Sequence, residues 1–157
     1  MVTATHSRSV SAYMLILCGV WLIGLGLYFM FLRPTLLPED LRYMKLGTGE
    51  IQSAVPGLGS WLQKVFRVMG GFIAGTGALT LLVARSSCAL RGKWNRFALA
   101  VTGALTVGLM SVTNFQLDSD FKWILLIPSM LWIVALASPS SAASAECAHL
   151  ENPEPRL

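Results

Sequence analysis

Four long apolar stretches, separated by shorter polar segments, set the pattern of this sequence. The first, Val10 to Leu32, contains no charged residue and is longer than the apolar core of a signal peptide, so it is expected to be a retained anchor. A helix needs about 20 apolar residues to cross a hydrocarbon core about 30 Å thick. The pattern therefore predicts an all-α, polytopic membrane protein, a bundle of four transmembrane helices over residues 10–32, 61–84, 97–117 and 121–137.

The segment between the first two stretches, residues 33–60, has a different pattern. Pro38 suits the first turn of a helix, and the carboxylates of Glu39 and Asp40 suit the positive end that a helix has at its N-terminus. Apolar residues then recur at helical spacing, and a second short pattern of this kind follows at about residues 50–55. We expect two short amphipathic helices that form a cap over one end of the bundle.

The composition agrees with a membrane protein. Of the 157 residues, 54% are hydrophobic and only 13% are charged, whereas about a quarter of the residues of a soluble domain are charged. The net charge of +4 comes from scattered lysines and arginines, without the basic face of a nucleic-acid-binding protein. The expected partner is therefore membrane lipid and not nucleic acid. The three cysteines lack the close spacing of metal ligands, so we expect no metal and no other cofactor.

The short loops indicate an orientation. The loop between the second and third stretches carries four basic residues and no acid, namely Arg85, Arg91, Lys93 and Arg96. The next loop carries Asp118 and Asp120. Because basic loops stay on the cytoplasmic side, we expect both termini in the cytoplasm and the cap outside. Residues 138–157, rich in serine, alanine and proline, are expected to form a disordered cytoplasmic tail after a membrane domain over residues 1–137.

Small residues mark the faces on which the predicted helices are expected to pack. Gly71 and Gly75 form a GxxxG motif in the second stretch, and Ala100 and Ala104 lie along one side of the third. Lipid does not drive apolar helices together, so close backbone contact at such residues is a common means of association. The alternative interpretation is a substrate groove lined by exposed backbone.

Arg67 is the most informative charged residue, because it lies inside the second stretch and heads its glycine-rich face. A cation at that depth needs an acidic partner or a route to the interface. Two interpretations stay open: an ion pair with an acid of the cap, or a cation that binds a ligand. The candidate ligand- or partner-binding residues are Arg67, Glu39, Asp40, Arg42 and Asn114. Arg42, three residues after Glu39, is also placed to pair with it, and Asn114 either joins this polar cluster or marks the membrane interface.

No catalytic residue is expected. The two histidines, His6 and His149, lie in the terminal segments, and the sequence contains no P-loop, GxGxxG or HExxH motif. Adjacent carboxylates on one short helix point in different directions, which does not suit acid–base catalysis. An enzyme that acts on lipid through Glu39 or Asp40 is therefore the least favoured hypothesis.

Two sequence motifs resemble a known group of proteins. They are "GLYFMFLRP" at the end of the first stretch and "RVMGGFIAGTG" in the second. Over residues 1–85 the chain resembles small four-span bacterial inner-membrane proteins, broadly the DoxX-like and uncharacterised families. The resemblance implies a bacterial plasma membrane location and a four-helix bundle. It carries over no catalytic residue, because these families lack an agreed common activity.

We therefore expect a non-enzymatic membrane protein that acts through helix packing, homo-oligomerisation or association with a larger membrane complex. The alternative is a carrier or binder of a small apolar or anionic molecule. That molecule would lie in the outer-leaflet half of the bundle, with Arg67 as its charge anchor.

Overall fold

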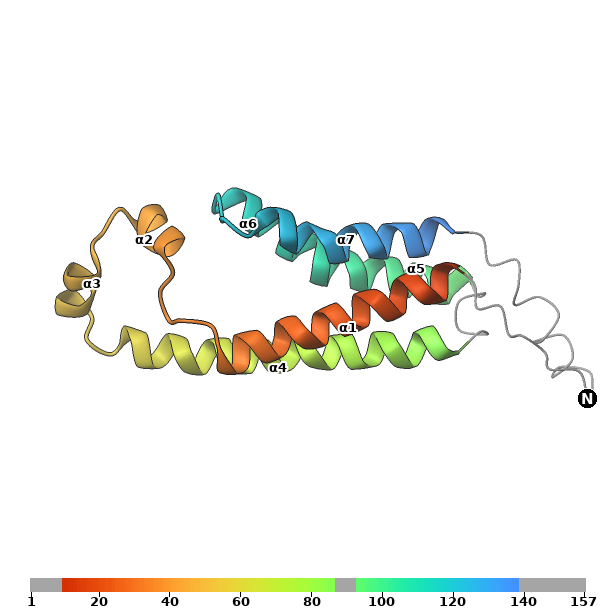
Figure 1. Cartoon of the computed structure of the whole chain (residues 1–157), viewed down its shortest axis with the longest axis horizontal. Helices are drawn as coiled ribbons and strands as arrows, with labels where there is room; N and C mark the ends of the chain where they lie inside the picture. The colour runs from red at the N-terminus through yellow and green to blue at the C-terminus, as the bar shows by residue number, and fades with distance from the viewer. Residues whose placement is uncertain (1–9, 87–92, 139–157) are drawn as a thin grey trace, which may run out of the picture.

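The computed structural model describes residues 10–86 and 93–138, and within these ranges every regular element is helical. The elements, shown in Figure 1, are α1 (Val10–Phe31), α2 (Pro38–Met44), α3 (Thr48–Ala54), α4 (Leu58–Arg85), α5 (Lys93–Gly103), the π-helical segment η1 (Ala104–Gly108), α6 (Leu109–Gln116) and α7 (Lys122–Ala137). The prediction of an all-α protein is confirmed. The predicted disordered tail lies, apart from Ser138, outside the described residues.

Three helices are long and apolar enough to cross a membrane: α1, α4 and the continuous stretch Lys93–Gln116 that α5, η1 and α6 form together. Large apolar side chains face outward on them, as they do on helices surrounded by lipid; Leu82 is 61% exposed and Phe97 is 61% exposed. These lengths and surfaces are those of a membrane protein. The apolar helix α7 has only 16 residues, about 24 Å at 1.5 Å per residue, so it is shorter than the other three.

The long helices lie side by side as two pairs (Figure 1). α4 runs antiparallel to α1 along its length, and α5, η1 and α6 pack on α7. α1 and α7 join the pairs, with hydrogen bonds from Ser11 Oγ to the carbonyl of Ala135 (2.7 Å) and from Cys18 Sγ to the carbonyl of Pro128 (3.5 Å). In contrast, α4 has few contacts with the α5–η1–α6 helix. The two pairs are therefore joined along one side only.

Four glycines bring α1 and α4 into backbone contact. A Cβ atom built on Gly26 would lie 2.6 Å from the carbonyl oxygen of Gly70, and one built on Gly19 would lie 2.9 Å from that of Gly77. No side chain fits between the helices at these points. Without a Cβ the backbones can approach closely, which is how small residues join helices in a membrane.

The GxxxG motif is not part of this contact. Gly71 and Gly75 are exposed, and nothing described beyond their own helix lies within 4 Å of a Cβ atom built on either. Within the described residues, these two glycines therefore do not pack against a neighbouring helix of the chain. The reason is rotation: successive residues are about 100° apart around a helix, so Gly70 faces α1 and Gly71 does not.

In the third long helix, a glycine between the two predicted alanines lies against α7. Ala100 and Ala104 are exposed, whereas Gly103 lies so close to α7 that a Cβ atom there would overlap the indole of Trp132. That indole donates a hydrogen bond to the carbonyl of Leu99, at 3.0 Å. The close approach of this helix to α7 therefore occurs at Gly103.

Two buried serines tie the same helices together. The hydroxyls of Ser111 in α6 and Ser129 in α7 lie 2.7 Å apart, and Ser129 also lies within 2.8 Å of the carbonyl oxygen of Val107. Ser111 reaches the carbonyl oxygen of Leu125 across the interface, at 3.1 Å. Each hydroxyl has one proton to donate and two lone pairs to accept, so the cluster satisfies itself. Among the residues that the structure describes, no buried polar side-chain atom lacks a partner.

Helices form in the segment predicted to be a cap. At the start of α2, Oδ2 of Asp40 accepts the backbone N–H of Leu37 at 2.9 Å, and at the start of α3, Oε2 of Glu50 accepts that of Gly47 at 2.7 Å. In both places an acid in the first turn satisfies an N–H that the helix leaves free. Figure 1 shows α2 and α3 beyond the last turn of α1. We call this end of the molecule, where α1 ends and α7 begins, the α2 end.

Candidate binding groove

A cavity of about 560 Å³ lies between α4 on one side and η1 and α6 on the other. Its walls are largely apolar and include Leu22 of α1, Met69 and Ile73 of α4, Leu105 of η1 and Met110 of α6. Because α4 has few contacts with the α5–η1–α6 helix, the cavity is partly open to the side. We call this cavity the groove.

Arg33 places a positive charge at the α2 end of the groove. Its guanidinium carbon lies 3.7 Å from the centre of the Phe66 ring and 5.3 Å from that of Phe29. Nη1 donates to the carbonyl of Pro34 at 3.2 Å, and only 11% of the side chain is exposed. The negative face of an aromatic ring attracts a cation. Packing and electrostatics therefore hold the guanidinium in one place.

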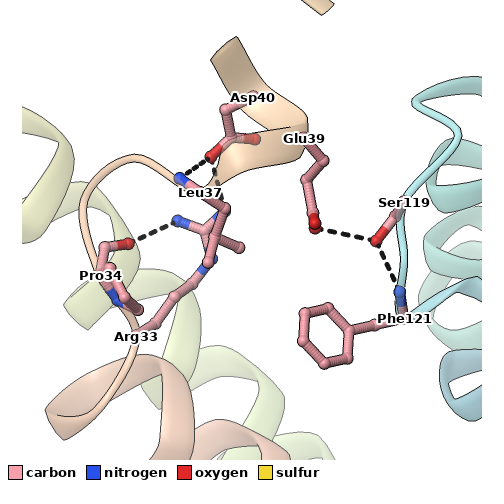
Figure 2. A network of polar contacts seen from close by, with 7 residues as sticks. All are labelled: Arg33, Pro34, Leu37, Glu39, Asp40, Ser119 and Phe121. Atoms are coloured by element: carbon pink, nitrogen blue, oxygen red, sulfur yellow. Dashed lines mark hydrogen bonds and ion pairs between the residues drawn. The ribbon is translucent and has the colours of Figure 1, made fainter. Parts of the chain in front are cut away.

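Asp40 pairs with this guanidinium, and both residues line the groove. Nη2 of Arg33 lies 3.5 Å from Oδ2 of Asp40, and the same oxygen accepts the N–H of Leu37 at 2.9 Å (Figure 2). A charge-assisted N–H···O bond is ordinarily about 2.7–2.9 Å long. The closer bond of Asp40 is therefore the one that starts α2, and its bond to Arg33 is long.

α2 also reaches the second helix pair. Glu39 is buried, and its Oε1 accepts the hydroxyl of Ser119 at 2.9 Å; that hydroxyl oxygen accepts the N–H of Phe121 at 3.2 Å (Figure 2). Nη2 of Arg42 donates to Oδ1 of Asp120 at 2.8 Å, and the hydrogen bond and charge of Asp120 raise the pKa of Arg42 above its usual value. α2 thus connects the end of α1 to the loop between α6 and α7.

That loop has a defined conformation. Asp118 is in the left-handed region, with φ 47°, and its N–H donates to the carbonyl of Phe115 at 3.2 Å, while the N–H of Ser119 donates to that of Asn114 at 3.0 Å. This is the Schellman pattern of helix ends. Lys122 forms an ion pair with Asp118, and its hydrogen bond and charge hold the pKa of that carboxyl below its usual value. The turn fixes Ser119 in the position where Glu39 meets it.

A second cavity, of about 380 Å³, lies between α4 and α5, on the far side of Thr76 from the α2 end. Thr76 lines both cavities, and the second is also lined by Thr80, Asn95, Thr102 and Trp132. The hydroxyls of Thr76 and Thr80 donate to carbonyls one turn earlier in α4, at 2.9 and 2.7 Å. These hydroxyls are satisfied within their own helix.

Four of the five predicted site residues lie near the groove. Glu39, Asp40 and Arg42 meet at the α2 end, although Arg42 pairs with Asp120 and not with Glu39. Asn114 lines the groove, and its side-chain amide donates to the carbonyl of Met110 within the same helix, at 2.8 Å.

Arg67 does not join this cluster. It is exposed, it lines neither cavity, and it forms no ion pair with any acid in residues 10–86 and 93–138. Of the two interpretations of Arg67, the ion pair with an acid of the cap is not formed within the described residues, because Asp40 pairs with Arg33 and Glu39 with Ser119. Phe66, one position earlier on α4, is the residue that faces Arg33.

One of the two aromatic contacts of Arg33 could have been predicted from the sequence. Phe29 lies four residues before it, and residues at that spacing are neighbours on a helix, so a cation–aromatic pair between them was open to prediction. The contact with Phe66 was not, because it depends on how α1 and α4 pack. The sequence marked Arg33 only as the end of an apolar stretch.

Metal binding has no support in the described ranges. No group of three histidine, cysteine or acidic side chains gathers there as metal ligands would. Comparisons with protein-family models, with curated proteins and with solved structures find no match to this chain. The resemblance to DoxX-like proteins therefore stays a prediction, and the geometry of the groove carries the functional interpretation.

Proposed function

We propose that the chain is a four-span, non-enzymatic membrane protein that binds an amphipathic, lipid-like molecule in the groove. In this arrangement α7 is the fourth span, and a bilayer can thin locally around such a short helix. The α2 end faces outward from a bacterial plasma membrane, with both termini in the cytoplasm. The charges support this orientation: Arg85, Lys93 and Arg96 lie toward one end, and Asp118 and Asp120 toward the other.

The observation that carries the proposal is a fixed charge at one end of a largely apolar groove. Arg33 and Asp40 are the charged residues that line the groove in the described part of the chain. An apolar chain would lie between Met69 and Leu105, and a polar head would then reach Arg33. The volume of about 560 Å³ is in the usual range of ligand sites, about 300–1,000 Å³.

A steric block of the groove tests the proposal. The protein is purified in mild detergent, and its co-purifying lipids are counted by native mass spectrometry. We expect Met69→Trp to lose bound lipid, because the indole occupies the space between α4 and α6. Val68→Trp is the matched control: Val68 is the neighbouring residue, is 60% exposed and does not line the groove. Equal lipid binding by both variants would contradict the proposal.

A second candidate function is association with another membrane helix, in a homo-oligomer or a larger complex. The observation that favours it is the open surface at Gly71 and Gly75, together with the exposed Ala78 one turn later. Such a face permits close helix contact. Gly71→Leu combined with Gly75→Leu should then reduce the oligomeric mass in native mass spectrometry while leaving lipid binding in the groove intact. A monomeric wild-type protein would exclude the homo-oligomer.

A further inference from the structure

We propose that the ligand of the groove is an anionic phospholipid, and that Asp40 competes with the lipid phosphate for Arg33. This inference rests on the proposed function and adds the charge of the head group and a means by which the protein limits its own affinity. Arg33 and Asp40 are held to different degrees. Arg33 is fixed by several contacts, whereas its bond to Asp40 is a single, long one.

The guanidinium of Arg33 is held in advance of binding. The ring of Phe66 covers one face at 3.7 Å, Phe29 lies near, and the carbonyl of Pro34 accepts Nη1. A side chain that is already ordered loses little conformational entropy when a ligand arrives. A guanidinium also offers its donors as a planar fork that matches two oxygens of a phosphate.

One carboxylate oxygen of Asp40 makes both the contact with Leu37 and the contact with Arg33. Oδ2 accepts the N–H of Leu37 at 2.9 Å and meets Nη2 of Arg33 at 3.5 Å. A phosphate with its oxygens at about 2.8 Å from the guanidinium would make the stronger bond. Asp40 can lose its contact with Arg33 and still start α2, since the bond to Leu37 is separate. α2 would also keep its contacts through Glu39 and Arg42.

The groove points to a lipid as the source of the anion. Apolar side chains such as Phe72 and Leu109 line it beside the charged pair, and the groove is partly open to the side, where acyl chains of the bilayer lie in the proposed arrangement. A free phosphate would leave these walls unfilled. A phospholipid places a phosphate and a chain on one molecule, so it matches both parts of the groove. Asp40 then weakens its binding and keeps it exchangeable.

The test uses the full-length protein in nanodiscs that contain phosphatidylglycerol together with diacylglycerol, which has the same chains but no phosphate. Native mass spectrometry after release gives the ratio of the two lipids bound. We expect the wild type to favour phosphatidylglycerol and Arg33→Gln to lose about thirtyfold of that preference, the usual scale for a hydrogen bond to a charged group. Asp40→Asn should raise the preference about fivefold, because its amide oxygen still accepts the N–H of Leu37 but no longer competes as an anion.

Asp120→Asn is the matched control. It removes the same charge at the α2 end, from a residue that pairs with Arg42 and does not line the groove. An equal rise in Asp40→Asn and Asp120→Asn would mean general attraction of anions and would overturn the inference, as would an unchanged ratio in Asp40→Asn. If Arg33→Gln does not fold, the two aspartate variants still decide. Failure of the proposed function has a different signature, because Met69→Trp would then retain all of its lipid.

Discussion

Between α1 and α4 the backbones touch at Gly26 against Gly70 and at Gly19 against Gly77, whereas between the α5–η1–α6 helix and α7 side chains bridge the gap. The second interface has hydrogen bonds from hydroxyls and from an indole to carbonyls of the opposite helix. Both means suit a membrane, in which burial of apolar surface does not hold helices together.

The difference explains where the groove lies. Backbone contact requires glycine at each crossing, and bridging hydrogen bonds require a hydroxyl or an indole opposite a carbonyl. Where α4 faces η1 and α6, the hydroxyls of Thr76 and Thr106 donate within their own helices and do not bridge the gap. The walls there also carry bulky apolar residues such as Phe72 and Leu109. The two pairs are joined through α1, α7 and α2 instead, so a space remains between their outer helices.

The largest effect is expected from a methyl group at the backbone contact. Gly70→Ala places a Cβ atom 2.6 Å from the carbonyl oxygen of Gly26, and backbone cannot move aside as a side chain can. We expect a loss of about 3 kcal/mol of stability, or no folded protein, in thermal unfolding in detergent. Gly71→Ala, one residue away and in open space, should be neutral or stabilising by up to about 1 kcal/mol. Similar losses in both variants would mean that α1 and α4 do not touch there.

A smaller loss is expected at the serine cluster. Replacing both Ser111 and Ser129 with alanine should lower the free energy of unfolding by about 1.5 kcal/mol, because each hydrogen bond between membrane helices contributes little. The two single variants should add up to more than the double variant, since they share one bond. Thr106→Val should cost almost nothing, because that hydroxyl donates to Thr102 of its own helix. Additive single variants would show that the serines act independently.

Loss of the contact between Glu39 and Ser119, which links the two helix pairs, should destabilise α2 and not the whole protein. Ser119→Ala leaves the buried Glu39 without its hydroxyl donor, and we expect α2 to open more easily by about 1 kcal/mol. Hydrogen exchange of the α2 amides measures this, while the amides of α1 and α4 serve as the internal reference. Faster exchange throughout the protein, and not in α2 alone, would contradict a local link.

The smallest effect is expected from a change of pH, through the ion pair of Asp118 and Lys122 in the loop between α6 and α7. Lys122 holds the pKa of Asp118 below its ordinary value of 3.8, so the charged form stabilises the folded protein above that value. This contribution is lost as the pH falls through the lower folded-state pKa. Asp118→Asn should therefore show a slightly flatter decline in stability at acid pH than the wild type. An identical decline in both proteins would mean that the exposed pair contributes nothing.

The positions of the helices were predictable because apolar periodicity and helix-start residues are local signals. Pro38, Glu39 and Asp40 marked the start of α2, and α2 begins there. The faces on which helices pack were not predictable in this way. One residue of rotation separates Gly70, which touches α1, from Gly71, which faces open space.

Two of the predicted site residues, Asp40 and Asn114, line the groove. Its cation is Arg33, which was not among the predicted site residues. Arg67 was chosen from the sequence because it lies inside an apolar stretch. The position of Phe66 opposite Arg33 depends on the antiparallel contact of α1 and α4, and only the folded chain contains that information.

The π-helical segment has a consequence for changes in chain length. A π turn holds one residue more than an α turn needs, so deleting one residue between Ala104 and Gly108 would let η1 become ordinary α-helix. The length of the span would change little. The face of α6 would keep its direction, because the seven α-helical residues then separating Gly103 and Ser111 turn about 700°, close to two full turns, so both would stay against α7. Eight residues of uninterrupted α-helix would instead turn Ser111 about 80° away from α7. The wider π turn thus accommodates the additional residue without moving the face of α6.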